Sequence, residues 1–305
     1  MHPSAVTLSG LGSTFREAAF GPPRAAPWVT VARIFITALL IGVGVDQVVS
    51  AIREWPLHDM DTYLAAAMRL RSGQSPYVHE VAYNAFWYAP WFAAVWIPFT
   101  FLPRVVVAVM WSALLLVATG LVSLRLARLG PSGLLLALLL GPSLFAVSAG
   151  GNVQSLILLP LLDWPARRGS AVWLGIVASL KVTPLLLVLV YIRRRQWHAA
   201  LVAVGAAVLL LLPGVAMGLF WSGSSTDWGG SLASVSPVLY GLAVLGAAMA
   251  SFAVRQRFAV TAAAVASVFA LPRLFVYDST LLAAGTASSQ SRRRELPARE
   301  PLNGE

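Results

Sequence analysis

Long apolar runs with almost no charge between them are the feature that most restricts what this chain can fold into. The runs recur from Val31 to Ala284, and 58% of all residues are hydrophobic whereas only 11% are charged. An ordinary soluble domain carries about 25% charged residues. The composition therefore excludes a soluble globular protein and predicts an all-α integral membrane bundle, because a helix satisfies its own backbone hydrogen bonds in lipid.

The lengths of the apolar runs indicate which of them can cross a bilayer. A spanning helix needs about 20 apolar residues. Four runs reach or approach this length, namely 31–49, 105–124, 199–220 and 237–254. The runs 134–147, 153–162 and 258–271 are shorter, and 86–102 is interrupted by Pro90 and Pro98. Since short helices at membrane depth must be buried or line a cavity, we expect about 8–10 membrane segments, several of them short or re-entrant, around an internal site.

The basic residues indicate the topology of the chain. The net charge is +10, and 21 of the 22 basic residues are arginine. Most arginines lie in pairs or triplets at the ends of apolar runs, as cytoplasmic anchors do. We therefore interpret them as a topology signal and expect no nucleic-acid partner. The expected cytoplasmic groups are the N-terminal tail, Arg125/Arg128, Arg167/Arg168, Arg193 to Arg195, Arg255/Arg257 and Arg292 to Arg294.

This placement predicts the domain organisation. Residues 1–27 form a cytoplasmic tail, 28–287 a multi-pass domain of the cell membrane, and 288–305 a disordered cytoplasmic tail. The connection 50–85, with three bases and four acids, becomes an outer loop. The scheme requires that 86–102 does not fully cross and that the chain turns near Lys181 and Asp278 at the outer side. The unusual polar residues then meet on the extracytoplasmic face.

Two carboxylates follow the first apolar run, in His58-Asp59-Met60-Asp61-Thr62-Tyr63. A carboxylate partly removed from water at a membrane surface can have a raised pKa and act as a general base toward a hydroxyl. We assign this role to Asp59, for which the alternative is that it caps the N-terminus of a helix over 63–71. Asp61 is a candidate second carboxylate, and the alternative is that it caps the N-terminus of a helix over 63–71.

The expected helix over 63–71 is amphipathic. Leu64 and Met68 lie four residues apart on one face, and Arg69 and Arg71 lie on another. A helix of this kind can lie in the membrane interface and guide a lipid headgroup, with Arg69 as a phosphate ligand. The alternative is a helix packed on the bundle whose arginines are simply solvated.

Lys181 is the one lysine of the chain, and it lies in the middle of an apolar stretch. A cation at membrane depth costs at least about 2.5–3.5 kcal/mol, so it requires a counter-charge or a polar cavity. A lipid-linked phosphate is one such counter-charge. The alternatives are an ion pair with Asp163 or Asp278, or a side chain that extends to the membrane surface at a hairpin tip.

Three further groups of residues are candidates for the pocket. Gly150-Gly151-Asn152 and Gln154 open a short helix, whose N-terminus favours anions, although Gly-Asn is also an ordinary turn. Arg273 and Asp278 lie five residues apart and either serve the site or satisfy each other. The aromatic residues of 86–96 form an interfacial belt or, alternatively, stack on a sugar. With no cysteine and four scattered histidines, no metal or cofactor is expected.

Several of these residues together resemble glycosyltransferase family 87. The early motifs are Asp59-x-x-x-Tyr63, Ala65-Ala66, Gly73, Pro76-Tyr77 and Tyr88-Ala89-Pro90. The later ones are Gly151-Asn152, Gly175, Lys181-Val182-Thr183-Pro184, Arg193-Arg194-Arg195-Gln196-Trp197 and Leu271-Pro272 through Tyr277-Asp278. The resemblance extends from about Asp59 to Asp278.

The resemblance implies a GT-C-type polytopic bundle that acts as an inverting α-mannosyltransferase. It implies a polyprenyl-phosphate sugar donor, a glycolipid or glycan acceptor of the cell envelope, and a catalytic aspartate in the first outer loop, which corresponds to Asp59. Lys181, Arg273 and Arg69 then bind the donor phosphate, and the pocket contains Tyr63, Tyr88, Asn152, Gln154 and Asp278.

The residues leave two other functions open. The chain is short for the family it resembles, so a truncated homologue could act as a non-catalytic subunit of an envelope complex. A transporter that carries a lipid-linked sugar without chemistry is the other alternative, for which inverted repeats would be expected.

Overall fold

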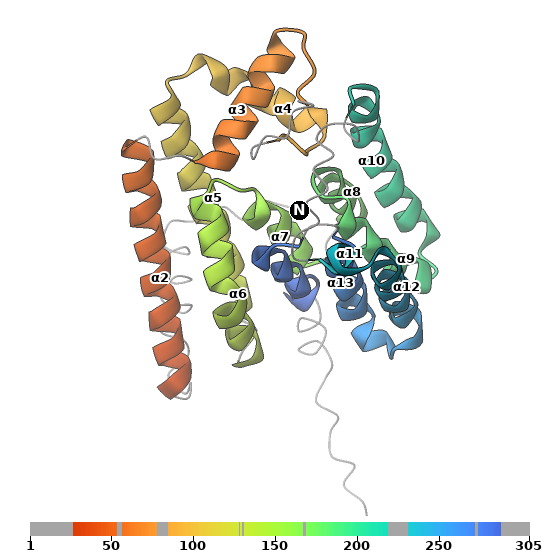
Figure 1. The fold of residues 1–305 in the computed structure, drawn as a ribbon. Coiled ribbons are helices and arrows are strands. Elements are labelled where there is room, and N and C mark those ends of the chain that lie inside the picture. Colours follow the sequence, from red (N-terminus) through yellow and green to blue (C-terminus); the bar gives the residue numbers. More distant parts are fainter. Residues whose placement is uncertain are drawn as a thin grey trace, which may run out of the picture.

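Helices joined by turns make up the part of the chain that the structure describes. The computed structural model describes residues 27–53, 57–77, 85–127, 129, 131–166, 169–218, 231–271 and 274–287, and these contain no strand. Figure 1 shows two groups of helices side by side, with a pair of short helices lying across one end. We call this the α3 end, and the opposite one the arginine end.

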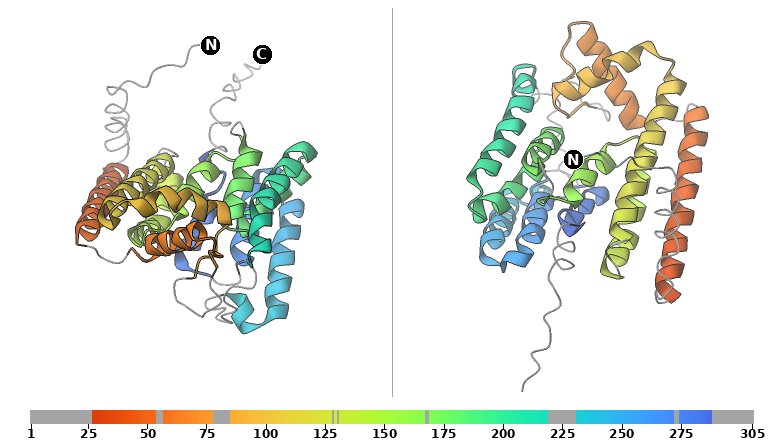
Figure 2. Two further views of the ribbon diagram at one scale, coloured as in Figure 1. Left: turned by 90° about the horizontal axis from the view of Figure 1, so that it is seen from above. Right: turned by 180° about the vertical axis from the view of Figure 1, so that it is seen from behind.

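The first group consists of three long helices. These are α2 (Pro27–Ile52), α5 (Arg104–Ala127) and α6 (Pro131–Ala149), which pack against one another (Figure 2). α6 is longer than the run 134–147 from which we expected it, because its first and last turns use polar and small residues. A buried apolar cluster that includes Val122, Leu134 and Leu144 joins these helices to α7 (Gln154–Leu162).

The second group is built from two helical hairpins. The topology expected from the sequence required the chain to turn near Lys181 and near Asp278. α8 (Ser170–Leu180) is followed by η2 (Thr183–Leu187) and α9 (Val188–Arg193). Ser170 at the start of α8 hydrogen-bonds Tyr191 near the end of α9, with their oxygens 2.7 Å apart, so the chain turns back at Lys181. α13 (Ala259–Phe269) and η4 (Val276–Ala283) pack against each other in the same way, and Asp278 lies in the first turn of η4.

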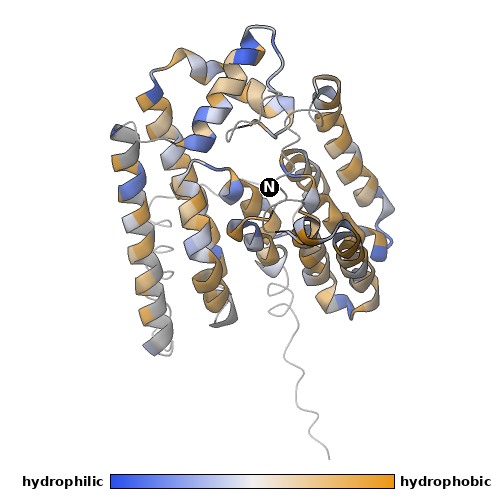
Figure 3. Cartoon of the chain, in the orientation of Figure 1, coloured by the Kyte–Doolittle hydropathy of each residue, from blue (hydrophilic) through white to orange (hydrophobic). Residues whose placement is uncertain are grey.

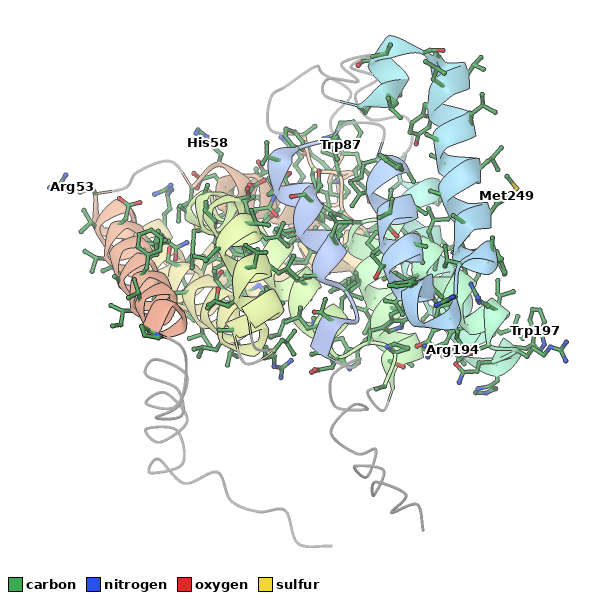
Figure 4. The ribbon with its side chains drawn as sticks, turned by 90° about the horizontal axis from the view of Figure 1, so that it is seen from below. Arg53, His58, Trp87, Arg194, Trp197 and Met249 are labelled. Atoms are coloured by element: carbon green, nitrogen blue, oxygen red, sulfur yellow. The ribbon has the colours of Figure 1, made fainter. Side chains whose placement is uncertain are left out.

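The remaining helices of this group form its outer side. α10 (Trp197–Ala216) packs on α8, and α12 (Pro237–Ala253) packs on α13. Two short elements, α11 (Leu232–Val235) and η3 (Gln256–Phe258), flank α12. Met249 projects from α12 away from the bundle (Figure 4) and is 67% exposed, as a side chain in contact with lipid would be.

α3 (His58–Arg71) and α4 (Pro90–Trp96) lie across one end of the bundle. Pro90 occupies the first turn of α4 and Pro98 that of η1 (Ile97–Phe101), as the missing N–H of proline requires. Together α4 and η1 extend roughly 20 Å, which is too short to cross a hydrocarbon core of about 30 Å. The segment 86–102 therefore lies at the end of the bundle.

Two expectations about this region were wrong. The helix begins at His58, several residues before Tyr63, and its N-cap Leu57 makes no side-chain cap, so Asp61 is not a capping residue. Its buried face consists of Met60, Tyr63, Ala66 and Ala67, whereas Met68 is 47% exposed. α3 thus packs on the bundle, which was the alternative to a helix lying in the membrane interface, and its contact face includes Tyr63 but not Met68, because the aromatic residues that follow it provide the contact surface.

The aromatic residues of 86–96 mostly form core and do not make an interfacial belt, whereas the alternative of stacking on a sugar stays a prediction. Phe86, Phe92 and Trp96 are buried. Phe92 and Trp96 pack against Tyr63, Trp96 also packs against Trp111, and Phe86 packs against Phe92, with ring centroids 4.8–6.5 Å apart. Only Trp87 of this group is largely exposed, at 49%, and it points outward (Figure 4). The aromatic core anchors α3 and α4 to the start of α5.

The arginine groups that the structure describes lie at the end of the bundle opposite α3. Arg125 forms an ion pair with Asp163 at 2.8 Å, and Trp164 next to it packs on Tyr191. Arg193 donates hydrogen bonds to the carbonyl groups of Ser251 and Val254 at the end of α12. Arg194 and Trp197 lie together at this edge (Figure 4). Arg128, Arg167, Arg168, Arg257 and Arg292 to Arg294 lie outside the described residues or side chains.

Two of the described helices, α5 and α10, are long and apolar enough to cross a membrane. Figure 3 shows hydrophobic residues along most of the helices, with hydrophilic residues on α3 and near the helix ends. α12 is also apolar but has only 17 residues. The structure is therefore consistent with a protein associated with a membrane.

Candidate active site

Asp59 is held at the α3 end by the turn between α6 and α7. The backbone N–H of Asp59 donates to the carbonyl oxygen of Gly150 at 3.1 Å. Gly151 has φ +85°, and a Cβ atom at this position would lie 3.2 Å from the backbone nitrogen of Met60. Glycine is therefore needed at 151 for both its backbone conformation and the close approach of α3.

Asn152 links this turn to the Asp59 carboxylate. Its Nδ2 donates to Asp59 Oδ2 at 3.3 Å, and its Oδ1 accepts a hydrogen bond from the backbone N–H of Gln154 at 3.0 Å. The two residues are 93 positions apart in the sequence. The structure thus brings together two residues that the sequence indicated separately.

Gln154 connects this hydrogen-bonded network of Asp59 and Asn152 to the turn at Lys181 and to the first turns of η4. It is fully buried, its Oε1 accepts from Lys181 Nζ at 2.9 Å, and its Nε2 donates to Thr280 at 2.9 Å. Lys181 Nζ also lies 2.5 Å from Asp278 Oδ1 and 4.7 Å from the centre of the Tyr277 ring. Of the alternatives for Lys181, the ion pair with Asp278 is the one observed, whereas Asp163 pairs with Arg125.

The electrostatic environment of Asp59 suits a base. Burial raises the pKa of its carboxyl above the usual value, while the hydrogen bond from Asn152 and the charges of Lys181 and His58 oppose this shift. A base with a raised pKa accepts a proton more readily near neutral pH. The carboxylate remains partly exposed.

Asp61 has a structural partner. Arg104, at the start of α5, donates from Nε to Asp61 Oδ1 at 2.9 Å and from a terminal nitrogen to Oδ2 at 2.8 Å. This two-point ion pair fastens α3 to α5. The sequence analysis did not identify Arg104. Its position, as a single arginine at the expected outer end of the apolar run 105–124, was a signal that a carboxylate lies nearby.

The remaining expected site residues fall into four cases. Asn152, Gln154 and Asp278 belong to the network but are each at most 4% exposed. Tyr63 and Tyr88 lie behind it, with their hydroxyl groups 3.2 Å apart and buried. Arg69 is ten residues beyond Asp59 on α3, or about 15 Å along the helix. Arg273 lies outside the described residues, so the expected Arg273–Asp278 contact does too.

An apolar cavity of about 540 Å³ adjoins the network. Its walls come from α4, α5, α7 and α8, and they include Trp91, Trp96, Trp111, Val153, Ile176 and Leu180. Trp111 donates a hydrogen bond from Nε1 to the carbonyl oxygen of Gly151 at 2.7 Å, and Leu180 immediately precedes Lys181. The cavity therefore borders both the turn that holds Asp59 and the tip that holds Lys181.

The polar cluster contains carboxylates, amides and one ammonium group. The described residues include no group of three His, Cys, Asp or Glu side chains that could hold a metal ion. Chemically, the arrangement combines a carboxylate, Asp59, and a largely buried cation, Lys181, beside an apolar cavity.

Comparison with known proteins identifies the family. The model of glycosyltransferase family 87 matches residues 86–290, which is about two thirds of the chain. No curated protein and no solved structure matches the chain significantly. The matched segment includes Asn152, Gln154, Lys181 and Asp278, and begins after Asp59. The chain therefore belongs to glycosyltransferase family 87, whose members transfer a sugar from a donor to an acceptor.

Proposed function

We propose that this protein moves a hexose, specifically mannose, from a polyprenyl-phosphate donor to a glycolipid or glycan acceptor of the cell envelope. The observation that carries this proposal is the position of a partly exposed carboxylate, Asp59, beside an apolar cavity and a buried cation. A sugar donor attached to a lipid needs such a site, because its chain prefers an apolar chamber and its phosphate needs polar partners.

The reaction is a single displacement with inversion at the anomeric carbon. Asp59 takes the proton of the acceptor hydroxyl while that oxygen bonds to the anomeric carbon. The bond between this carbon and the donor phosphate oxygen breaks, and its electron pair leaves with the prenyl phosphate. One proton is gained by Asp59, and one glycosidic bond replaces the glycosyl phosphate bond.

Lys181 is the described cation best placed to stabilise the departing phosphate, since positive charge in a water-poor site is effective at a developing anion. In the observed arrangement it is paired with Asp278 and Gln154. The donor phosphate would therefore replace Asp278 as the anion that is paired with Lys181. Arg273 is a second candidate ligand, whereas we assign no such role to Arg69.

The apolar cavity is proposed to receive the part of the prenyl chain nearest the phosphate. Its volume of about 540 Å³ is within the range of ligand pockets, about 300–1,000 Å³. The remainder of the chain would lie in the bilayer, around which we propose a GT-C-type polytopic bundle in the cell membrane. The α3 end then faces the extracytoplasmic side and the arginine end the cytoplasm, as the positive-inside rule expects.

The first prediction tests the base. Asp59→Asn keeps the shape of the side chain but removes its basicity, so transfer should fall by about 10²- to 10⁴-fold. The measurement is mannose incorporation into lipid acceptors by the purified full chain supplied with polyprenyl-phosphate mannose. Asp163→Asn, at the arginine end, is the matched control and should retain transfer.

Three outcomes would contradict the proposal in different ways. If Asp59→Asn transfers as fast as the unsubstituted protein, Asp59 is not the base. If the purified unsubstituted chain binds the donor but transfers nothing, the protein acts as a carrier or as a subunit of a larger complex. If the protein transfers a different sugar from its polyprenyl-phosphate donor and does not transfer mannose, the proposed sugar is wrong but the proposed displacement reaction still holds.

A further inference from the structure

The contacts of Asn152 point to a role that the proposed function does not itself include. We propose that Asn152 is the positioning residue for the base: it holds Asp59 Oδ2, so that Oδ1 is the oxygen that receives the acceptor proton. This inference rests on the proposed function, because it presumes that Asp59 acts as the base.

The orientation of the Asn152 amide follows from its partners. The backbone N–H of Gln154 can only donate, so the atom of Asn152 that faces it at 3.0 Å is the oxygen Oδ1. The NH2 group must then point to Asp59 Oδ2, 3.3 Å away. Asn152 is 4% exposed, which leaves its side chain little freedom to turn.

The two oxygens of Asp59 are thereby made different. Oδ2 faces the turn, since a Cβ atom placed on Gly150 would lie 3.8 Å from it. Oδ1 accepts no hydrogen bond from any residue that the structure describes, and the side chain is partly exposed. An oxygen without a protein partner is the one available to an acceptor hydroxyl.

The charged and titratable groups around Asp59 come from several elements. His58 lies on α3, Lys181 at the tip after α8 and Tyr88 before α4, while Tyr63 lies one turn along α3. Asp278 acts through Lys181, with which it is paired, and the Asp61–Arg104 pair lies further along α3. Asn152→Ala adds no charge to this set but also removes the interaction of Asn152 with Tyr88, so its effect on titration reports the whole amide group.

The second prediction tests this role through the pH dependence of transfer. The hydrogen bond from Asn152 lowers the pKa of Asp59, so its loss in Asn152→Ala must raise that pKa. A base with a higher pKa becomes protonated at higher pH, and the acid side of the kcat/KM profile should move upward. At a pH on that limb, transfer relative to the plateau should fall by about tenfold, since a hydrogen bond to a charged group is worth roughly one pKa unit or more.

A second variant covers the case in which alanine leaves the turn unstable. Asn152→Asp keeps the oxygen that accepts from Gln154 but places a carboxylate against Asp59. Like charges raise the pKa further, so its acid limb should lie above that of Asn152→Ala. Thr119→Val is the control, because Thr119 bonds Ser148 and Ser155 on either side of the same turn without touching Asp59.

The outcomes separate this inference from the function on which it rests. The inference is supported if both Asn152 variants shift the profile while Thr119→Val follows the unsubstituted enzyme. It is overturned if Asn152→Ala and Asn152→Asp leave the profile in place, or if Thr119→Val shifts it equally. If Asp59→Asn transfers normally, the proposed base itself fails, and that result is visible without any Asn152 variant.

Discussion

Single residues decide the electrostatics of the site, and Lys181 is the clearest example. Its side chain is 15% exposed and that of its partner Asp278 is 1% exposed. Sequence analysis identified Lys181 as a lone cation in an apolar stretch but left its counter-charge open between a lipid-linked phosphate and two aspartates. The choice depended on which hairpin tip lies beside it, and this is a property of packing between residues 97 positions apart.

The third prediction concerns the stability of this pair. Lys181→Met or Asp278→Leu alone leaves a buried charge without its partner, and should lower the free energy of unfolding by about 3–5 kcal/mol. The double variant removes both charges and should recover most of this loss. Thermal unfolding in detergent is the measurement, and a double variant as unstable as the sum of the single ones would contradict the interpretation.

At the scale of elements, helix lengths and close contacts place the polar residues. The broken stretch around Lys181 was expected to be a hairpin tip, and α8, η2 and α9 form that hairpin. Close packing of α8 on α10 depends on Gly175, where a Cβ atom would lie 2.5 Å from Ala206 Cβ and 2.7 Å from the carbonyl oxygen of Ala203. Small residues at such crossings let membrane helices approach closely.

The fourth prediction follows from this contact. Gly175→Ala must push α8 and α10 apart, which should cost roughly 1–3 kcal/mol of stability. Gly205→Ala on α10 is the matched control, because nothing lies within 4 Å of a Cβ atom there. The control should be neutral or slightly stabilising, since alanine favours a helix over glycine by about 0.5–1 kcal/mol. Equal melting temperatures for the two variants would refute the close contact.

At the scale of the whole molecule, the two ends of the bundle differ in how their arginines are arranged: the α3 end carries single ones, such as Arg69, Arg71 and the Asp61-paired Arg104, and the opposite end carries clusters. The polar network lies at the α3 end, and the described arginine groups at the ends of α5, α9 and α12 lie opposite. We propose the extracytoplasmic placement of the α3 end on the basis of this asymmetry.

The fifth prediction tests that orientation. The chain contains no cysteine, so single cysteines can be introduced without removing others. Ser72→Cys, after α3, should react with a membrane-impermeant maleimide in intact cells, whereas Gln196→Cys, between α9 and α10, should react only after permeabilisation. Both positions are exposed. The reverse pattern would place the site in the cytoplasm.

The sequence by itself determined the helical class, the apolar segments and the chemistry-bearing residues. These are local properties, because hydropathy, proline positions and isolated charges can be read within a few residues. Only the tertiary structure decided that Asp61 binds Arg104, that Lys181 binds Asp278, and that the aromatic residues after α3 form core. Each of these depends on which surfaces bury each other between residues distant in the chain, and local patterns carry no information about that choice.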